Sequence, residues 1–249
     1  MEFALAIGCG IAIGSVLGYV GAGGSMLAVP MFIYIFDMTP VQATTASLIV
    51  VFAGALSGVI PKLRKSEVLV RDALVIWSLG LITNFYGSYI LPKLERSVVI
   101  TGFSLVLITA GISMLIKGPS NDSERRVSPI ALVGISLIIG ALTGLFGIGG
   151  GFLAIPILIL FYNVSPARAA GTSLFIITIN TITGFFAHYR HWHEVQWRTP
   201  LIIAITTVIV ARLASHHSSR FAPQTLKRAF ALLVFSIAAF QLVETWLIA

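Results

Sequence analysis

The chain has few charged residues. Of its 249 residues, 10% are Asp, Glu, Lys or Arg, whereas 57% are hydrophobic. Ordinary soluble domains carry about 25% charged residues, so this composition indicates a membrane protein. Several apolar stretches approach the roughly 20 residues that a helix needs to cross the hydrocarbon core. We therefore predict an all-α, multi-pass bundle of transmembrane helices in the lipid bilayer of the cell inner membrane.

Cysteine and catalytic motifs are also scarce. Cys9 is the single cysteine, which excludes an internal disulfide and a cysteine metal cluster. His191 and His193 are too close in sequence to share a helix face, so we predict neither a metal site nor a cofactor. No Walker A motif and no pairing of a nucleophile with a base is present, so we do not expect an enzyme. We assign the net charge of +7 to loops near lipid headgroups and not to nucleic-acid binding.

Acidic residues are missing from the predicted membrane centres. All nine fall at predicted loops, linkers or ends of apolar runs, so a proton relay built on a buried carboxylate has no evident carrier. Coupling to a proton or a sodium ion stays open. His188 is a candidate for gating or coupling because its charge changes near neutral pH. Arg212 lies in an apolar run and is a second candidate, although an arginine at a helix end can simply reach the headgroups.

What the chain does contain is an internal repeat. A glycine-rich motif spans Gly18–Pro30 and recurs at Gly144–Pro156, an offset of 126 residues. The same offset relates Pro40 to Pro166, and a register held over some forty residues indicates a duplication. We predict a first transmembrane repeat at residues 1–117, a polar linker at 118–128 and a second transmembrane repeat at 129–249.

Each copy of the motif interrupts an apolar run. We predict helix breaks at residues 21–24 and 147–151, each followed by a short or re-entrant helix. Irregular backbone at membrane depth survives only where it lines a cavity or is buried in protein, and matching breaks in two halves point to a transporter's binding site. The helix that starts after a break presents free N–H groups and partial positive charge, which favour an anion. A tight helix crossing is the alternative interpretation.

Hydroxyl-rich helix starts support the same hypothesis. Pro40 and Pro166 each open a helix whose first turns carry Ser and Thr, and these hydroxyls can donate to ligand oxygens or bond to backbone and neighbouring helices. The predicted substrate-binding residues are Gly21, Gly23, Gly24, Ser25, Thr45, Ser47, Gly147, Gly149, Gly150, Gly151, Thr172, Ser173 and Asn180. We predict that the two halves bring these residues into one anion pocket between paired helix N-termini.

The same residues carry a family resemblance. The motif Gly-X-X-Gly-X-Gly-Gly-X-X-Leu-X-X-Pro is followed by Pro40, Ala43 and Ser47 in the first half and by Pro166, Ala169 and Thr172-Ser173-Leu174 in the second. This pattern resembles the TauE/SafE family of sulfite-exporter-like permeases over nearly the whole chain. The second copy is the closer match. The resemblance implies a secondary carrier of small sulfur-containing anions, such as sulfite, sulfonates or sulfoacetate-like compounds.

Several alternatives stay open. An anion channel or a facilitator for another small organic anion is favoured by the lack of an evident coupling carboxylate. An intramembrane enzyme or assembly factor is disfavoured by the single cysteine. Five crossings per half would make the repeats inverted, whereas four would make them parallel, and we favour inversion. Glycine-rich helix faces serve contacts within one chain or within a homodimer equally well.

Overall fold

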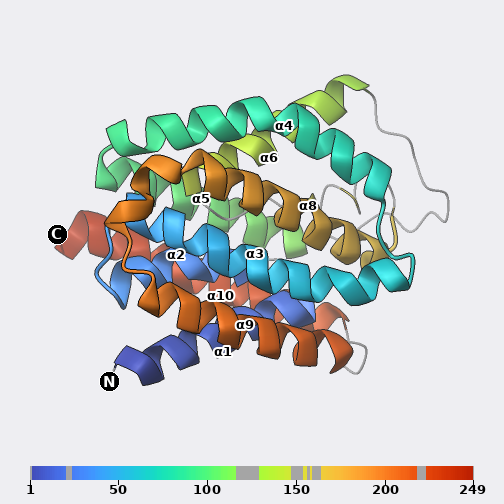
Figure 1. Cartoon of the computed structure of the whole chain (residues 1–249), viewed down its shortest axis with the longest axis horizontal. Helices are drawn as coiled ribbons and strands as arrows, with labels where there is room; N and C mark the ends of the chain where they lie inside the picture. Colours follow the sequence, from blue (N-terminus) through green and yellow to red (C-terminus); the bar gives the residue numbers. More distant parts are fainter. Residues whose placement is uncertain are drawn as a thin grey trace.

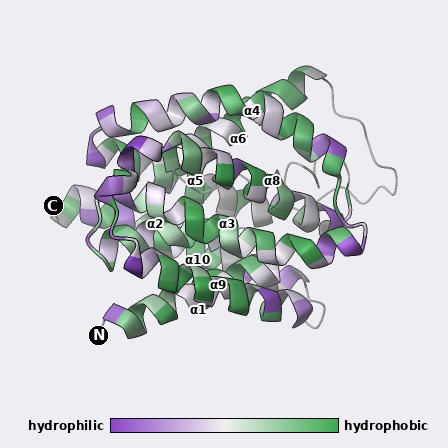
Figure 2. Cartoon of the chain, in the orientation of Figure 1, coloured by the Kyte–Doolittle hydropathy of each residue, from purple (hydrophilic) through white to green (hydrophobic). Residues whose placement is uncertain are grey.

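The computed structural model describes residues 2–20, 24–115, 129–146, 154–155, 158, 164–217 and 223–248. In these ranges the chain forms a bundle of helices that lie side by side (Figure 1). Hydrophilic residues gather at the two ends of the bundle, and hydrophobic residues lie along the helices between them (Figure 2). This distribution confirms the predicted all-α transmembrane bundle.

The described helices follow the repeat predicted from the sequence. The first half holds α1 (Glu2–Val20), α2 (Gly24–Tyr34), α3 (Pro40–Arg64), α4 (Val70–Ile90), η1 (Leu91–Lys93) and α5 (Arg96–Leu115). The second half holds α6 (Pro129–Phe146), α8 (Pro166–Ala187), η2 (Tyr189–Glu194), α9 (Arg198–His217), α10 (Pro223–Val243) and η4 (Glu244–Ile248). Among the described residues, five helices are long and apolar enough to cross a membrane: α1, α3, α4, α8 and α9.

Local signals explain where α3 and α2 begin. Thr39 caps α3: its hydroxyl accepts from the Gln42 N–H, the Gln42 side chain returns the bond, and Pro40 occupies the first helical position. α2 has the predicted short length. Pro30, however, lies in the interior of α2 and not near its start, so it removes one N–H from the middle of an already short helix.

Glycines allow two helix pairs to approach closely. α1 packs along α9, and α6 packs along α4. A Cβ added at Gly10 would lie 2.6 Å from Thr206 Cβ, and one added at Gly80 would lie 2.7 Å from the Ser136 carbonyl oxygen. These two contacts are equivalent in the 126-residue register. The predicted glycine face of α1 is therefore confirmed, except that Gly8 has nothing within 4 Å.

The two central helices run antiparallel. Gly58, late in α3, lies beside Leu174, early in α8, while Thr45 at the start of α3 lies beside His188 just after α8. α3 and α8 are equivalent in the register, as are α5 and α10, which also pack together. Antiparallel packing of equivalent helices is the arrangement expected of halves related by a two-fold axis in the membrane plane. It supports the inverted repeat, which stays a prediction.

Apolar side chains lie both inside and outside the bundle. Phe32 and Phe103 are almost fully buried, whereas Ile82 and Phe85 on α4 are more than half exposed. Large exposed apolar surface is costly in water and matches a protein whose outer face contacts lipid.

Candidate functional site

His188 is a buried side chain that joins three helices. It directly follows α8 and is 1% exposed. Its Nδ1 lies 3.1 Å from Thr45 Oγ1 of α3, and its Nε2 lies 3.2 Å from the Gly144 carbonyl oxygen of α6. The imidazole therefore ties the end of α8 to the start of α3 and to the last turn of α6.

The Gly144 carbonyl determines which nitrogen of His188 carries the proton. A carbonyl oxygen only accepts, so Nε2–H donates to Gly144 and Nδ1 can accept from the Thr45 hydroxyl. That hydroxyl also lies 2.7 Å from the Val41 carbonyl oxygen. Burial lowers the pKa of His188 to about 4, so the imidazole is neutral at pH 7.

The contact with Gly144 places His188 next to the second glycine-rich motif. α6 ends at Phe146, and carbonyls in the last turn of a helix lack partners within that helix. His188 supplies such a partner. The buried imidazole thus acts as a C-terminal cap for α6, three residues before the predicted break at 147–151.

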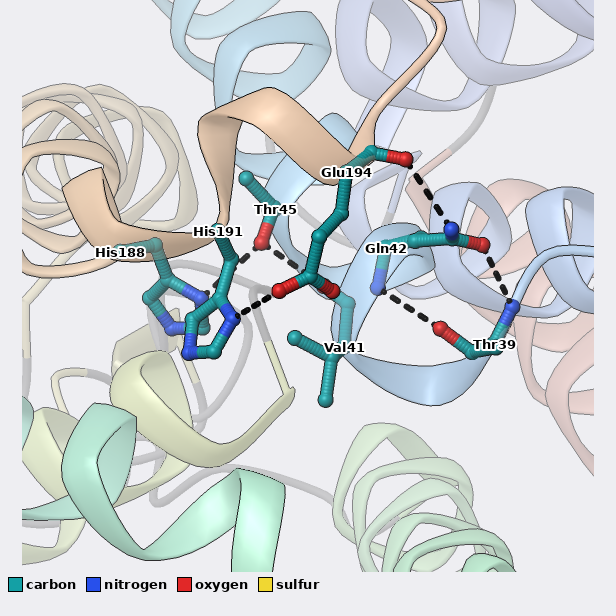
Figure 3. A network of polar contacts seen from close by, with 7 residues as sticks. All are labelled: Thr39, Val41, Gln42, Thr45, His188, His191 and Glu194. Atoms are coloured by element: carbon teal, nitrogen blue, oxygen red, sulfur yellow. Dashed lines mark hydrogen bonds and ion pairs between the residues drawn. The ribbon is translucent and has the colours of Figure 1, made fainter.

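The segment around His188 is docked on the start of α3 (Figure 3). Gln42 Nε2 donates to the Glu194 carbonyl oxygen at 3.0 Å, and His191 Nδ1 lies 2.7 Å from Glu194 Oε1. The two rings of His188 and His191 have centroids 6.3 Å apart but bind different partners. In the part of the chain that the structure describes, no three His, Cys, Asp or Glu side chains form a group that could hold a metal ion.

The opposite end of the α3–α8 pair is built differently. Thr172 Oγ1 accepts from the Leu69 N–H at 2.9 Å, and Lys62 Nζ lies 2.8 Å from Glu67 Oε2. In the 126-residue register Lys62 corresponds to His188. One end therefore holds a buried neutral imidazole, while the equivalent place at the other end holds a partly exposed ion pair.

The structure does not bring Thr45 and Thr172 together. Thr45 lies beside His188, whereas Thr172 lies beside the segment that follows α3. Seventeen residues of α3 separate Thr45 from Lys62, a length of about 25 Å at 1.5 Å per residue. Each threonine is buried and bonded to its own end of the bundle.

The remaining hydroxyl candidates, Ser47 and Ser173, are fully buried. Ser47 donates to the Thr44 carbonyl oxygen at 2.8 Å. Such a bond to the preceding turn is the alternative that the sequence left open for these hydroxyls.

A pair of asparagines lies between these two ends. Asn84 Nδ2 of α4 lies 3.3 Å from the Asn180 carbonyl oxygen and 3.3 Å from Thr183 Oγ1, both of α8. Because a backbone carbonyl only accepts, this contact fixes the orientation of the Asn84 amide. Asn84 Oδ1 is then a buried oxygen without a hydrogen-bond partner among the described residues.

The sequence predicted Asn180 but missed Asn84. The signal was present, because Asn84 interrupts the apolar span Val70–Lys93, and polar residues inside a membrane are often functional.

Most predicted glycines cannot be placed. Gly21, Gly23, Gly147, Gly149, Gly150, Gly151 and the side chain of Ser25 lie outside the described residues. A Cβ added at Gly24 would lie 2.5 Å from the Ile13 carbonyl oxygen, so this glycine permits a tight crossing of α1 and α2. Arg212 is exposed near the end of α9, whereas His188 precedes the start of that helix. The two gating candidates therefore lie at opposite ends of the bundle.

Comparison with known proteins identifies the family. The model of the family "Sulfite exporter TauE/SafE" matches residues 6–240. A "Probable membrane transporter protein" of Xylella fastidiosa (strain 9a5c) is 29% identical over 249 residues, which cover 96% of this chain and 95% of the relative. YunE of Bacillus subtilis (strain 168), with the same description, is 27% identical over 79% of this chain and 81% of its own. A relative in Methanocaldococcus jannaschii is 25% identical over 91% of each chain. The chain therefore belongs to the TauE/SafE sulfite exporter family and is a multi-pass membrane transporter.

Proposed function

We propose that this transporter is a secondary carrier of a small sulfur-containing anion, such as sulfite or a sulfonate, in the inner membrane. The observation that carries the proposal is the joint of His188 with Thr45 and Gly144, which connects the second glycine-rich motif to both central helices. A substrate bound at that motif would be sensed directly by α3 and α8.

The charge of the bundle interior favours an anion. Within the described ranges no Asp or Glu is buried, and the buried polar side chains are hydroxyls, amides and the neutral imidazole of His188. An anionic substrate therefore meets hydrogen-bond donors without a buried negative charge to repel it.

Alternating access would open the two ends of the α3–α8 pair in turn. One end is closed by Gln42 bonding to Glu194 beside His188, and the other by Leu69 bonding to Thr172. Each closure uses few polar contacts between a short segment and a helix start, so either can be released without unfolding the bundle. The substrate would be exposed to one side of the membrane at a time.

Counterflow in proteoliposomes tests this proposal. Vesicles preloaded with unlabelled substrate are mixed with trace labelled sulfite, a short-chain sulfonate, sulfate or acetate. We expect saturable uptake and transient accumulation of one sulfur-containing anion, and reduced uptake by Thr45→Val and Ser173→Ala variants. Equal uptake of acetate, or no uptake of any sulfur anion, would overturn the substrate class.

An anion channel is the second candidate. The observation that favours it is again the lack of a buried carboxylate in the described ranges that could carry a coupling proton. A channel would show flux that rises linearly with concentration and no counterflow, so the same assay separates the two functions.

A further inference from the structure

A cleft lies where α1 and α9 begin. Its volume is about 380 Å³, and its lining residues are Glu2, Phe3, Ala6, Arg198, Thr199 and Ile202. The two helices run parallel, because Gly10 lies beside Ile203 and Gly18 beside Ala214. Both helix starts therefore meet at the same hydrophilic end of the bundle (Figure 2), at the level where a membrane protein meets the lipid headgroups.

The lining of this cleft combines both charges with apolar surface. Glu2 and Arg198 are exposed, and neither forms an ion pair with any residue in the described part of the chain. Phe3, Ala6 and Ile202 supply apolar surface on the side that continues along the helices. An anion alone would meet Glu2, and a cation alone would meet Arg198, so a ligand that carries both charges and an apolar tail fits best.

We propose that this cleft binds the headgroup of a zwitterionic phospholipid with a primary ammonium group, namely phosphatidylethanolamine. Arg198 and the Thr199 hydroxyl bind the phosphate, since a guanidinium donates in a planar fork that matches phosphate oxygens. Glu2 accepts from the ammonium group. The first carbons of an acyl chain lie on Phe3 and Ile202, as amphiphiles do at a membrane interface.

The site exists on one face of the membrane only. The 126-residue register that relates the two glycine-packed helix pairs aligns Arg198 with Asp72, near the start of α4. Asp72 would repel a phosphate where Arg198 attracts it. Lipid bound at this cleft therefore contacts the start of α9 without an equivalent at the start of α4.

Native mass spectrometry of the detergent-purified protein tests the proposal. Phosphatidylethanolamine, phosphatidylcholine and phosphatidylglycerol with matched acyl chains are added at equal concentration. We expect preferential retention of phosphatidylethanolamine, a loss of about tenfold in its affinity for Arg198→Gln, and loss of the preference over phosphatidylcholine for Glu2→Gln. Arg71→Gln, which removes an exposed arginine from the first turn of α4, is the matched control and should retain the lipid.

Two results would overturn the proposal. Equal retention of phosphatidylethanolamine by the wild-type protein and Arg198→Gln would show that the cleft is not the site. Stronger retention of phosphatidylglycerol would show a general attraction of anionic lipid to basic loops. Melting temperatures of the variants confirm that each is folded, and lipid retention is measured without transport, so the result is independent of the transported substrate.

Discussion

The imidazole Nδ1 of His188 lies 3.1 Å from the hydroxyl oxygen of Thr45, although 143 positions separate the two residues. If His188 gained a second proton, Nδ1–H would donate to Thr45, whose hydroxyl would donate to Val41, while Nε2–H would still donate to Gly144. The hydrogen bonds could thus accommodate the charged ring. The free energy of burying its charge opposes this change.

The first prediction follows from this balance and concerns pH. The pKa of His188 is about 4 in the folded protein, against about 6.5 in an unfolded chain. Between these values the unfolded chain binds more protons, so the free energy of unfolding falls as pH decreases from 6.5 towards 4, by about 3 kcal/mol in total. This contribution is complete above pH 6.5. Melting temperatures in detergent between pH 4.5 and 8 measure the effect.

The variants His188→Gln and His191→Gln separate this effect from general acid sensitivity. Glutamine at position 188 can donate to Gly144 but does not titrate, so the acid-side slope should largely disappear. His191 is partly exposed and pairs with Glu194, so His191→Gln should retain the slope. An acid profile of His188→Gln identical to that of the wild-type protein would contradict the burial of a neutral imidazole.

The second prediction concerns the glycine contact between α4 and α6. A Cβ at Gly140 would press on the Gly80 carbonyl oxygen and lie 2.5 Å from Thr83 Oγ1, whereas one at Gly134 of the same helix has nothing within 4 Å. Gly140→Ala should therefore lower the free energy of unfolding by about 1–3 kcal/mol, the usual range for overpacking. Gly134→Ala should leave it unchanged or raise it slightly. Equal melting temperatures for the two variants would show that these helices do not pack so closely.

Glycine spacing predicted which face of α1 is packed, but not its partner. Gly10, Gly14 and Gly18 recur at a spacing of four and so lie on one helix face. That this face meets α9 depends on packing between segments nearly 200 positions apart, which no local pattern encodes. Gly8 falls outside the spacing and lies in open space.

The candidate site shows the same limit more sharply. Thr45 and Thr172 occupy neighbouring positions in the two aligned repeats, and the sequence therefore placed them in one pocket. Because α3 and α8 pack antiparallel, equivalent positions lie at opposite ends. The histidine at 188 was predicted as a gating residue, yet its partners could not be inferred, since they come from the other half and from the end of α6.

The third prediction separates stability from transport at Asn84. Its Oδ1 is buried without a hydrogen-bond partner among the described residues, and its Nδ2 bonds are long at 3.3 Å. Replacing a poorly satisfied buried amide by an apolar group of similar length is nearly neutral for folding. Asn84→Leu should therefore change the free energy of unfolding by less than about 1 kcal/mol but reduce transport, as expected of an oxygen kept free for a ligand.

Ser88→Ala is the matched control for Asn84→Leu. Ser88 is buried one turn further along α4, and its hydroxyl bonds only to the Asn84 carbonyl oxygen of its own helix. Its loss should leave transport and stability nearly unchanged. Normal transport by Asn84→Leu would show that the free oxygen has no part in the transport path.

The fourth prediction decides whether Thr172 binds substrate or holds the structure together. Its hydroxyl accepts the Leu69 N–H, a bond that spans 103 positions. Thr172→Val leaves that donor unpaired and should lower the free energy of unfolding by about 1–2 kcal/mol, while Thr172→Ser keeps the acceptor and should restore it. Thr178→Val, which removes only a bond to Leu174 in the preceding turn of the same helix, should be milder. If Thr172→Val instead melts like the wild-type protein yet no longer transports, the hydroxyl serves the substrate, and the Leu69 contact is only the closed state of that end.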